Sequence, residues 1–156
     1  MAKILTIPVR NRFTPVRRTI HKDPKCGVEC MFIHLTKSVG VKIFTNKGRA
    51  ERSCKRQRKA YRLGFAPKVL SRVKKCYTNN LHHLDHNDVL CGEVFCHCYM
   101  TQVVETRRNY SDNAIEKLEK KVRRARMSSG DLHNGNIGVI DGELVMIDFG
   151  DVSMER

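Results

Sequence analysis

The stretch of sequence that decides the fold is 128–151, SSGDLHNGNIGVIDGELVMIDFGD. It holds two apolar runs separated by Asp141 and Gly142, and an Asp-Gly pair in that position is typical of a two-residue hairpin turn. A turn centred on this pair places Ile137 opposite Met146. We therefore predict a β-hairpin in this stretch, with polar residues at its open end.

The open end of the predicted hairpin carries two oxygen-bearing side chains. Asn136 begins the first strand and Asp148 ends the second. Strict alternation would point the two to opposite faces, so one must leave strand geometry if both are to reach one ion; Gly135 permits this. A carboxylate and an amide oxygen suit Mg²⁺, which shares its remaining ligand positions with water and nucleotide phosphates. Asp131 would then face the transferred phosphoryl group and accept a proton from the attacking hydroxyl.

The motifs D-L-H-N-G-N (131–136) and I-D-F-G (147–150) resemble the catalytic loop and the metal-binding motif of the protein kinase-like superfamily. The resemblance is greatest to the D-L-H-x-x-N variant of its aminoglycoside-phosphotransferase-like and RIO-like branches. It implies that Asp131 is the catalytic base, Asn136 a metal ligand and Asp148 the principal metal ligand. It also implies ATP and Mg²⁺ as cofactors.

The same resemblance implies functional residues upstream. Lys42, in the run Val-Lys-Ile-Phe, would bind the nucleotide phosphates; the alternative is a solvated strand lysine. A helix after this strand would carry a glutamate that orients the lysine. Glu51 is the only acidic residue between Lys42 and Gly64 and is therefore the candidate, with Gln57 as the alternative. Gly27 is the one glycine near the expected nucleotide-covering loop, because a G-x-G-x-x-G pattern is absent.

The expected fold class is α+β and protein kinase-like, with an antiparallel-sheet N-lobe and a strongly reduced C-lobe. Six residues follow Gly150, so the C-lobe would consist of one main helix and the catalytic-loop hairpin. We divide the chain into a basic, extended arm (1–25), the N-lobe (26–104) and the reduced C-lobe (105–156). Apolar spacing and Gly or Pro limits predict the following elements: strands at 30–35, 39–44, 68–70 and 89–104, helices at 49–63 and 111–127, and a loop at 77–87.

The charge of the chain indicates a polyanionic partner. Thirty Lys and Arg against sixteen Asp and Glu give a formal charge of +14 on 156 residues. Nucleic acid, nucleotide phosphates or an acidic protein surface would each complement this charge; the alternative is that the excess cations only keep a small protein soluble. No stretch is long and apolar enough for a membrane span.

The seven cysteines are an odd number, which favours reduced thiols over a disulfide framework. We therefore expect a cytoplasmic protein, in a bacterium or a phage-infected cell. A zinc site is an alternative use of the cysteines, but Cys96-x-Cys98 is tighter than the usual zinc spacing. Buried strand thiols are the interpretation that we prefer. The other residues of the alternative zinc set are Cys91, His97, His82, His83 and His86.

These observations predict an ATP- and Mg²⁺-dependent phosphotransferase that transfers the γ-phosphate to a hydroxyl acceptor on a protein. The alternative is a weakly active or inactive pseudokinase-like module whose basic surface binds nucleic acid or an acidic protein. The helix at 111–127 has few obvious partners for its apolar face. We therefore also expect a second copy of the chain, or another partner, to complete the reduced C-lobe.

Overall fold

The structure is a computed structural model that describes residues 4–9, 12–17, 25–26, 30–78, 94–128 and 132–149. These residues form an α+β fold with a seven-stranded sheet, a two-stranded sheet and two α-helices. Every strand pair in both sheets is antiparallel. The expected α+β class with an antiparallel sheet is therefore confirmed.

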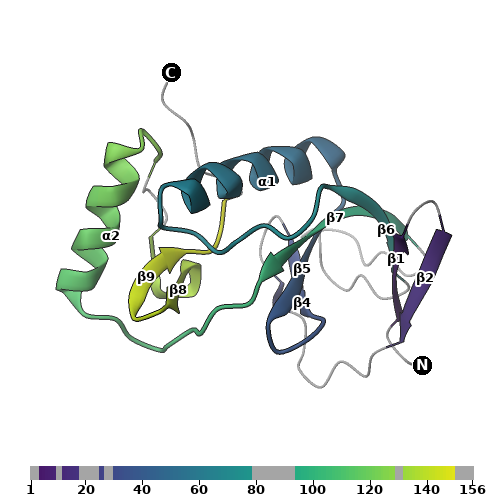
Figure 1. The fold of residues 1–156 in the computed structure, drawn as a ribbon, viewed down its shortest axis with the longest axis horizontal. Helices are drawn as coiled ribbons and strands as arrows, with labels where there is room; N and C mark the ends of the chain where they lie inside the picture. The colour runs from purple at the N-terminus through teal and green to yellow at the C-terminus, as the bar shows by residue number, and fades with distance from the viewer. Residues whose placement is uncertain are drawn as a thin grey trace.

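The large sheet has the strand order β2-β1-β6-β7-β5-β4-β3. Its longest strand, β7, lies between β5 and β6. After β5 the chain passes through a helix and returns to the sheet at β6, on the other side of the position that β7 then fills (Figure 1). The strands are β1 (Ile4–Val9), β2 (Arg12–Arg17), β3 (Lys25–Cys26), β4 (Met31–His34), β5 (Val39–Phe44), β6 (Lys74–Thr78) and β7 (Val94–Gln102).

The basic region 1–25 differs from the extended arm that the sequence predicts. Strands β1 and β2 pair with each other, and β1 also pairs with β6, so this region adds two strands to the sheet. The Arg and Pro content of the region favoured an arm. The segments ILTIPV and RFTPVR also carry β-branched and aromatic residues, however, and these favour strands when a neighbouring strand is available.

The two strands predicted around the turn at 35–38 are confirmed as β4 and β5. On β5, Val41 and Ile43 belong to one apolar cluster, whereas Phe44 packs with α1 residues in another. The alternation of a strand therefore puts Lys42 on the same face as α1. By contrast, the predicted strand at 68–70 makes a single β-bridge, from Val69 to Thr101.

Helix α1 (Lys47–Arg62) matches the predicted helix within two residues at its start. The Asn46 side chain caps it by accepting a hydrogen bond from the Arg49 amide at 3.1 Å. Gly64 follows the helix with φ +80°, a conformation that favours glycine. Tyr61 is 42% exposed and lies outside the buried face of the helix. The buried residues of α1 are Ala50, Ser53, Cys54, Gln57 and Ala60.

The hairpin predicted at 137–146 is confirmed in both turn and register. Strands β8 (Ile137–Ile140) and β9 (Glu143–Met146) pair so that Ile137 lies opposite Met146. Asp141 and Gly142 form the turn with φ values of +50° and +81°. Positive φ at both central residues is the conformation that an Asp-Gly pair favours.

Helix α2 (Asp112–Arg124) lies against this hairpin. Ser111 caps it by accepting a hydrogen bond from the Ala114 amide. Leu118 and Val122 on its apolar face are buried in a cluster with residues of α1, the hairpin and the segments that follow them. The apolar face therefore has partners within the chain, although few of them were obvious from the sequence. The other buried members of the cluster are Ala60, Phe65, Ala66, Met127, Ile137, Met146 and Phe149.

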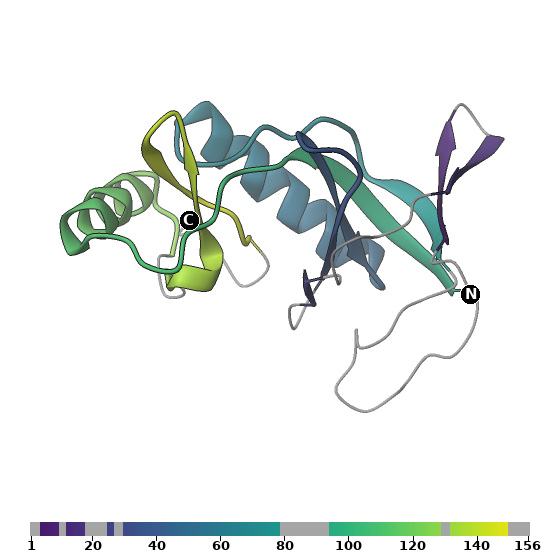
Figure 2. The same cartoon turned by 90° about the horizontal axis from the view of Figure 1, so that it is seen from below.

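Helix α1 connects the two parts of the fold. It covers β5 and β7 of the large sheet, and its C-terminal end reaches the hairpin, with α2 beyond (Figures 1 and 2). Two backbone hydrogen bonds join the hairpin to the rest of the chain, Met146 N to Phe65 O at 2.9 Å and Val139 N to Glu105 O at 2.8 Å. Neither helix of the described residues has the length and apolar character that a membrane crossing needs.

Candidate functional site

Lys42 is the centre of the candidate site. It extends from the middle of β5 beneath α1, and its residue is 6% exposed. The Nζ atom donates hydrogen bonds to Gln57 Oε1 at 3.2 Å and to the backbone carbonyl of Ile147. These bonds join a strand of the large sheet to α1 and to the segment that follows the hairpin.

Gln57 holds Lys42 through a buried network of hydrogen bonds. Its Oε1 atom also accepts from the Tyr99 hydroxyl at 2.9 Å. Its Nε2 atom donates to Pro67 O at 3.0 Å and to Thr101 Oγ1 at 2.6 Å. The Gln57 amide is therefore bonded at both its oxygen and its nitrogen, as a fully buried polar group must be to avoid an unpaired donor or acceptor.

Tyr99 connects this network to α1 a second time. Its hydroxyl lies 2.9 Å from Ser53 Oγ, and both residues are buried. Burial holds the pKa of the Tyr99 phenol well above its usual value, so the hydroxyl stays protonated and donates to Gln57. The network is therefore built from neutral groups around one ammonium, that of Lys42.

The electrostatics of Lys42 combine an unfavourable and a favourable effect. Burial lowers the pKa of its ammonium, because the charged form loses hydration; the attraction of Cys30, Asp148 and Cys54 raises it. Two aromatic rings also lie within reach of the charge. Nζ is 5.5 Å from the centroid of Phe149 and 5.9 Å from that of Tyr99. The Lys42 ammonium is poorly hydrated because it is buried, so water screens its charge little. A polyanionic ligand at this point would therefore be attracted to it strongly.

Asn136 and Asp148 lie next to each other at the open end of the hairpin. The Ile147 amide donates to Asn136 O at 2.9 Å, which extends the strand pairing by one step. Asn136 belongs to a 3₁₀ turn, Asn134–Asn136, and Asp148 follows the end of β9. Both residues thus lie outside the regular strands, as a shared ion would require. The turn is shaped by His133, whose Nδ1 accepts from the Gly135 amide at 3.0 Å.

The segment that carries Asp148 is anchored on its other side by Phe149. The Phe149 ring is fully buried in the cluster between α1, α2 and the hairpin. Its carbonyl accepts a hydrogen bond from Arg56 Nη1 at 3.2 Å. Asp148 therefore lies between Ile147, bonded to Lys42, and Phe149, bonded to Arg56.

Three of the residues predicted from the sequence are connected through Ile147: Lys42 donates to its carbonyl, its amide donates to Asn136 O, and Asp148 follows it in the chain. The structure does not bring Glu51 to Lys42. The side chain of Glu51 is 55% exposed and lies 3.6 Å from Lys47 Nζ on the outer side of α1, whereas the alternative, Gln57, contacts Lys42 directly. Asp131 and Gly27, the predicted catalytic base and loop glycine, lie outside the described residues.

Sequence reasoning did not identify Ser53, Tyr99 and Thr101 as parts of the site. A signal was present, because Ser53 and Gln57 are polar residues on the apolar face of α1. Such residues are rarely buried unless they are hydrogen-bonded, so they indicate a buried polar network. Their partners on β7 are 42 to 46 residues away and could not be chosen from spacing.

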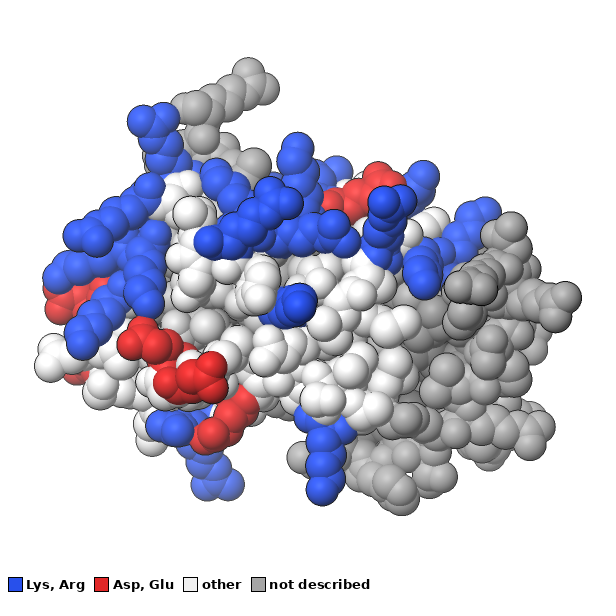
Figure 3. Space-filling view, viewed as in Figure 1, with Lys and Arg blue, Asp and Glu red and all other residues white. Residues whose placement is uncertain are grey.

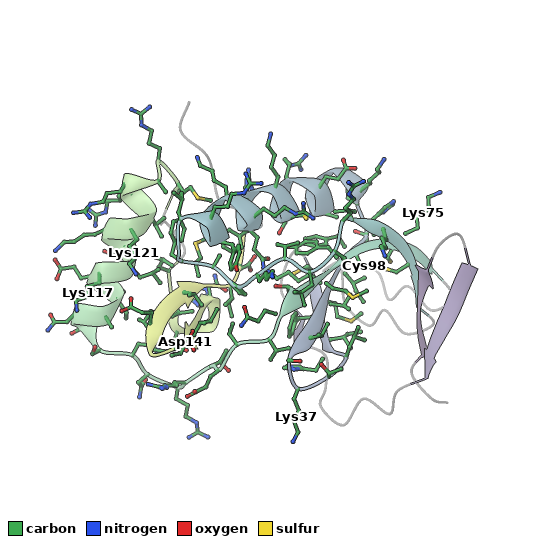
Figure 4. All side chains as sticks on the ribbon, in the orientation of Figure 1. Lys37, Lys75, Cys98, Lys117, Lys121 and Asp141 are labelled. Carbon is green, nitrogen blue, oxygen red and sulfur yellow. The ribbon has the colours of Figure 1, made fainter. Side chains whose placement is uncertain are left out.

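The cysteines on β6 and β7 are part of the sheet core, as the preferred interpretation held. Cys76, Cys96 and Cys98 are at most 1% exposed and pack with apolar residues such as Met31 and Val41. Of the three, Cys98 is labelled in Figure 4. Burial raises the pKa of the Cys96 thiol to about 11, so this side chain stays a neutral thiol in the core. The described residues contain no group of three or more His, Cys, Asp or Glu that could hold a metal. Of the remaining members of the alternative zinc set, His97 lies on β7 and is half-buried, whereas Cys91 and the three His of 82–86 lie outside the described residues.

The donors at the hairpin nevertheless fit Mg²⁺. Asp148 offers a carboxylate and Asn136 an amide oxygen, both hard ligands, and both side chains are partly exposed. Magnesium is usually bound by one or two protein oxygens together with water and substrate phosphates, not by an all-protein cage. The small number of protein ligands is therefore compatible with a metal that arrives with a nucleotide.

Comparison with known proteins gives no relative: no protein-family model, no curated protein and no solved structure matches this chain.

Proposed function

We propose that the protein is an ATP- and Mg²⁺-dependent phosphotransferase of protein kinase-like fold. It transfers the γ-phosphate of ATP to a hydroxyl group, and hydroxyl-bearing protein side chains are the first acceptor class. One observation carries the proposal: Lys42 and the segment 147–148, which are 105 residues apart, meet through the hydrogen bond from Nζ to Ile147 O. A buried ammonium beside a carboxylate and an amide oxygen suits a phosphate chain with its metal ion.

Lys42 would bind the phosphates of the nucleotide. The ammonium is oriented by Gln57, which takes the part that the family resemblance gives to a glutamate. Gln57 is neutral, so it positions Lys42 without cancelling its charge. The full charge of Lys42 is then available to the phosphate oxygens.

Asp148 and Asn136 would hold Mg²⁺ with the nucleotide. When bound, such an ion would supply positive charge beside the phosphates, and Asp148 and Asn136 are the residues that would hold it there. The protein contributes position: Asp148 is fixed between two bonded neighbours, Ile147 and Phe149. This anchoring would hold the metal ligands in place before the nucleotide arrives.

Asp131 would act as the base. The acceptor oxygen forms a bond to the γ-phosphorus, the bond from that phosphorus to the bridging oxygen breaks, and ADP leaves with the electron pair. The proton of the acceptor hydroxyl passes to the Asp131 carboxylate. The part of Asp131 rests on the sequence motif, since it lies outside the described residues.

The first testable prediction concerns Asp148→Asn. We expect Mg²⁺ and ATP together to raise the melting temperature of the wild-type protein, and we expect this rise to be lost in the variant because an amide does not replace the charged metal ligand. Transfer of labelled γ-phosphate, to the protein itself or to water, should fall at least about 10²-fold.

Asp141→Asn is the matched control, because it makes the same chemical change at the exposed turn of the same hairpin (Figure 4). It should keep both the wild-type melting shift and the wild-type transfer rate. Equal transfer by wild type and Asp148→Asn, or the lack of any Mg²⁺-dependent shift in the wild type, would contradict the proposal.

A second candidate function is a non-catalytic, nucleotide-binding scaffold. The hydrogen bond from Lys42 Nζ to Ile147 O favours it, because this bond already occupies one donor of the ammonium and can persist in a scaffold. This candidate predicts a Mg²⁺- and ATP-dependent melting shift that depends on Asp148, with no phosphate transfer. The two measurements above therefore separate the two candidates.

A further inference from the structure

A basic groove lies on the outer side of α1. One wall is α1 itself and the other is the segment 72–73 just before β6, and together they enclose about 650 Å³. The lining includes one carboxylate, that of Glu51, and two small side chains, Cys54 and Val73. The remaining lining residues are all cationic: Lys55, Arg58, Lys59, Arg62 and Arg72.

Four of these five cations form a row along one face of α1. Residues at i, i+3, i+4 and i+7 lie on the same side of a helix, and this is the spacing of Lys55, Arg58, Lys59 and Arg62. Seven residues of helix span about 10 Å. Arg72 faces the row from the other wall, so the groove is cationic on both sides.

The charge of this groove is not cancelled by the protein. Glu51 is paired with Lys47, and among the described residues none of the five cations takes part in an ion pair. Two of them are oriented instead by backbone carbonyls: Arg58 donates to Ser71 O at 3.0 Å and Lys59 to Ala125 O at 3.3 Å. Lys and Arg side chains gather along the whole of α1 in Figure 3, so the groove lies within a larger basic surface.

The lining indicates the chemistry of the partner. A docking site for a peptide uses apolar or aromatic anchors, and this groove offers only the side chains of Cys54 and Val73. A site for single-stranded nucleic acid stacks the bases on aromatic rings, and none of the described residues that line the groove is aromatic. A duplex exposes mainly its phosphates, with about one charge per 1.7 Å of axis, so a cationic row of about 10 Å would face several of them.

We propose that this groove binds the phosphate backbone of double-stranded nucleic acid, without sequence preference. The surface is separate from the Lys42 site, so the proposal goes beyond the phosphotransferase activity and does not rest on it. Binding should then be the same with and without Mg²⁺ and ATP, and the same in Asp148→Asn.

The test compares two double variants that lose the same charge. Lys55→Gln with Arg62→Gln alters the groove at two exposed side chains that make no hydrogen bond or ion pair among the described residues. Lys117→Gln with Arg124→Gln removes one lysine and one arginine from the exposed side of α2 (Figure 4). The probe is a fluorescein-labelled, mixed-sequence DNA duplex, titrated by anisotropy over a series of KCl concentrations.

We expect the groove variant to bind the duplex more weakly and with a smaller salt dependence. Each lost phosphate contact reduces the slope of log K against log salt by about 0.9, so the slope should become shallower by about 2. The α2 variant should keep the wild-type slope. An equal loss in both variants would show that net charge alone drives binding, and a wild-type protein that fails to bind at low salt would end the proposal.

Two further probes test the identity of the partner. The labelled single strand of the same sequence should bind more weakly than the duplex, and tighter binding of the single strand would contradict the assignment. Poly-L-glutamate should compete poorly at the same concentration of charges. If it displaces the duplex efficiently, and its own binding depends on Lys55 and Arg62, the partner is an acidic polypeptide and the nucleic-acid proposal is wrong.

Discussion

At the scale of single residues, Gln57 has a role that no charged residue could take over unchanged. Its oxygen accepts from Lys42 and Tyr99, while its nitrogen donates to Pro67 and Thr101. A glutamate in the same place would keep the two acceptor bonds and lose both donor bonds. The neutral amide therefore satisfies the buried carbonyl of Pro67 as well as positioning Lys42.

The Tyr99 hydroxyl provides a test of this network. Tyr99→Phe should lower the free energy of unfolding in urea by about 1–3 kcal/mol, because buried polar groups at Ser53 and Gln57 lose a partner. In a Ser53→Ala background the same change should cost less, since one of those groups is already absent.

The matched control is Tyr61→Phe, because Tyr61 is on the same helix as Ser53 but is 42% exposed. It should change the free energy of unfolding by less than about 0.5 kcal/mol. If Tyr99→Phe lowers the free energy of unfolding by the same amount in the wild type and in Ser53→Ala, then Ser53 and Tyr99 are not coupled.

Lys42 gives the stability a predictable pH dependence. Burial lowers the pKa of Lys42 in the folded protein below the ordinary value of 10.5. Between the two pKa values the unfolded chain holds a proton that the folded protein has lost, so this group adds stability as the pH rises towards 10.5. The free energy of unfolding of the wild type, measured relative to Lys42→Met, should therefore increase with pH over this window.

Asp148→Asn tests the cause of this effect. Asp148 attracts the Lys42 ammonium and raises its pKa, so the variant should shift the increase to lower pH. The quantity to measure is the difference in free energy of unfolding between Asp148→Asn and the double variant Asp148→Asn, Lys42→Met. The titration of the other groups is common to both variants and cancels in this difference. A difference between wild type and Lys42→Met that is flat, or that falls as the pH rises, would contradict the burial argument.

At the scale of elements, the hairpin depends on the absence of a side chain at Gly138. A Cβ atom there would lie 2.3 Å from Val104 Cγ2, and 3.2 Å from Glu105 O. Gly138→Ala should therefore lower the free energy of unfolding by about 1–3 kcal/mol, measured in urea, because the hairpin and the segment after β7 cannot keep their contact.

Val104→Ala is the variant that identifies the cause of this loss. It removes the methyl group that the new Cβ would meet, so the double variant Gly138→Ala, Val104→Ala should recover much of the lost stability. A double variant no more stable than Gly138→Ala would attribute the cost to the backbone of β8 instead.

Local signals explain which elements the sequence predicts well. The Asp-Gly pair decides the turn and the alternation decides the register, so Ile137 lies opposite Met146 as expected. Asn46, Ser111 and Gly64 mark the helix ends in the same way. Strand β6 was missed, because the segment KKCYT has no apolar alternation and owes its conformation to β1 and β7 on either side.

The candidate site shows the same division between local and distant information. Lys42, Asn136 and Asp148 were predicted from short motifs, and in the structure Ile147 connects them, because it bonds to Lys42 and Asn136 and precedes Asp148. Glu51 was chosen because it is the only acidic residue between Lys42 and Gly64. Its position on α1, however, puts its side chain on the exposed side of the helix. Charge is thus a weaker guide than helical phase, which puts Gln57 on the buried side.

At the scale of the whole molecule, the parts that could not be predicted are those that depend on distant segments. The apolar face of α2 has no partner in the neighbouring sequence. In the structure it is covered by Phe65 after α1, Ile137 and Met146 of the hairpin, and Phe149 beyond it. No periodic pattern in the sequence connects these positions. The partners of the α2 face therefore could not be identified from the sequence near the helix.

The bracing of the small hairpin also has a consequence for the behaviour of the protein at high concentration. An unpaired strand edge offers free amides and carbonyls to other chains and is a common origin of aggregation. Here each outer edge of the two-stranded sheet already has a backbone partner, Glu105 beside β8 and Phe65 beside β9. These two contacts therefore protect the hairpin from edge-to-edge growth, and a chain in which they open would expose both hairpin edges to pairing with other chains.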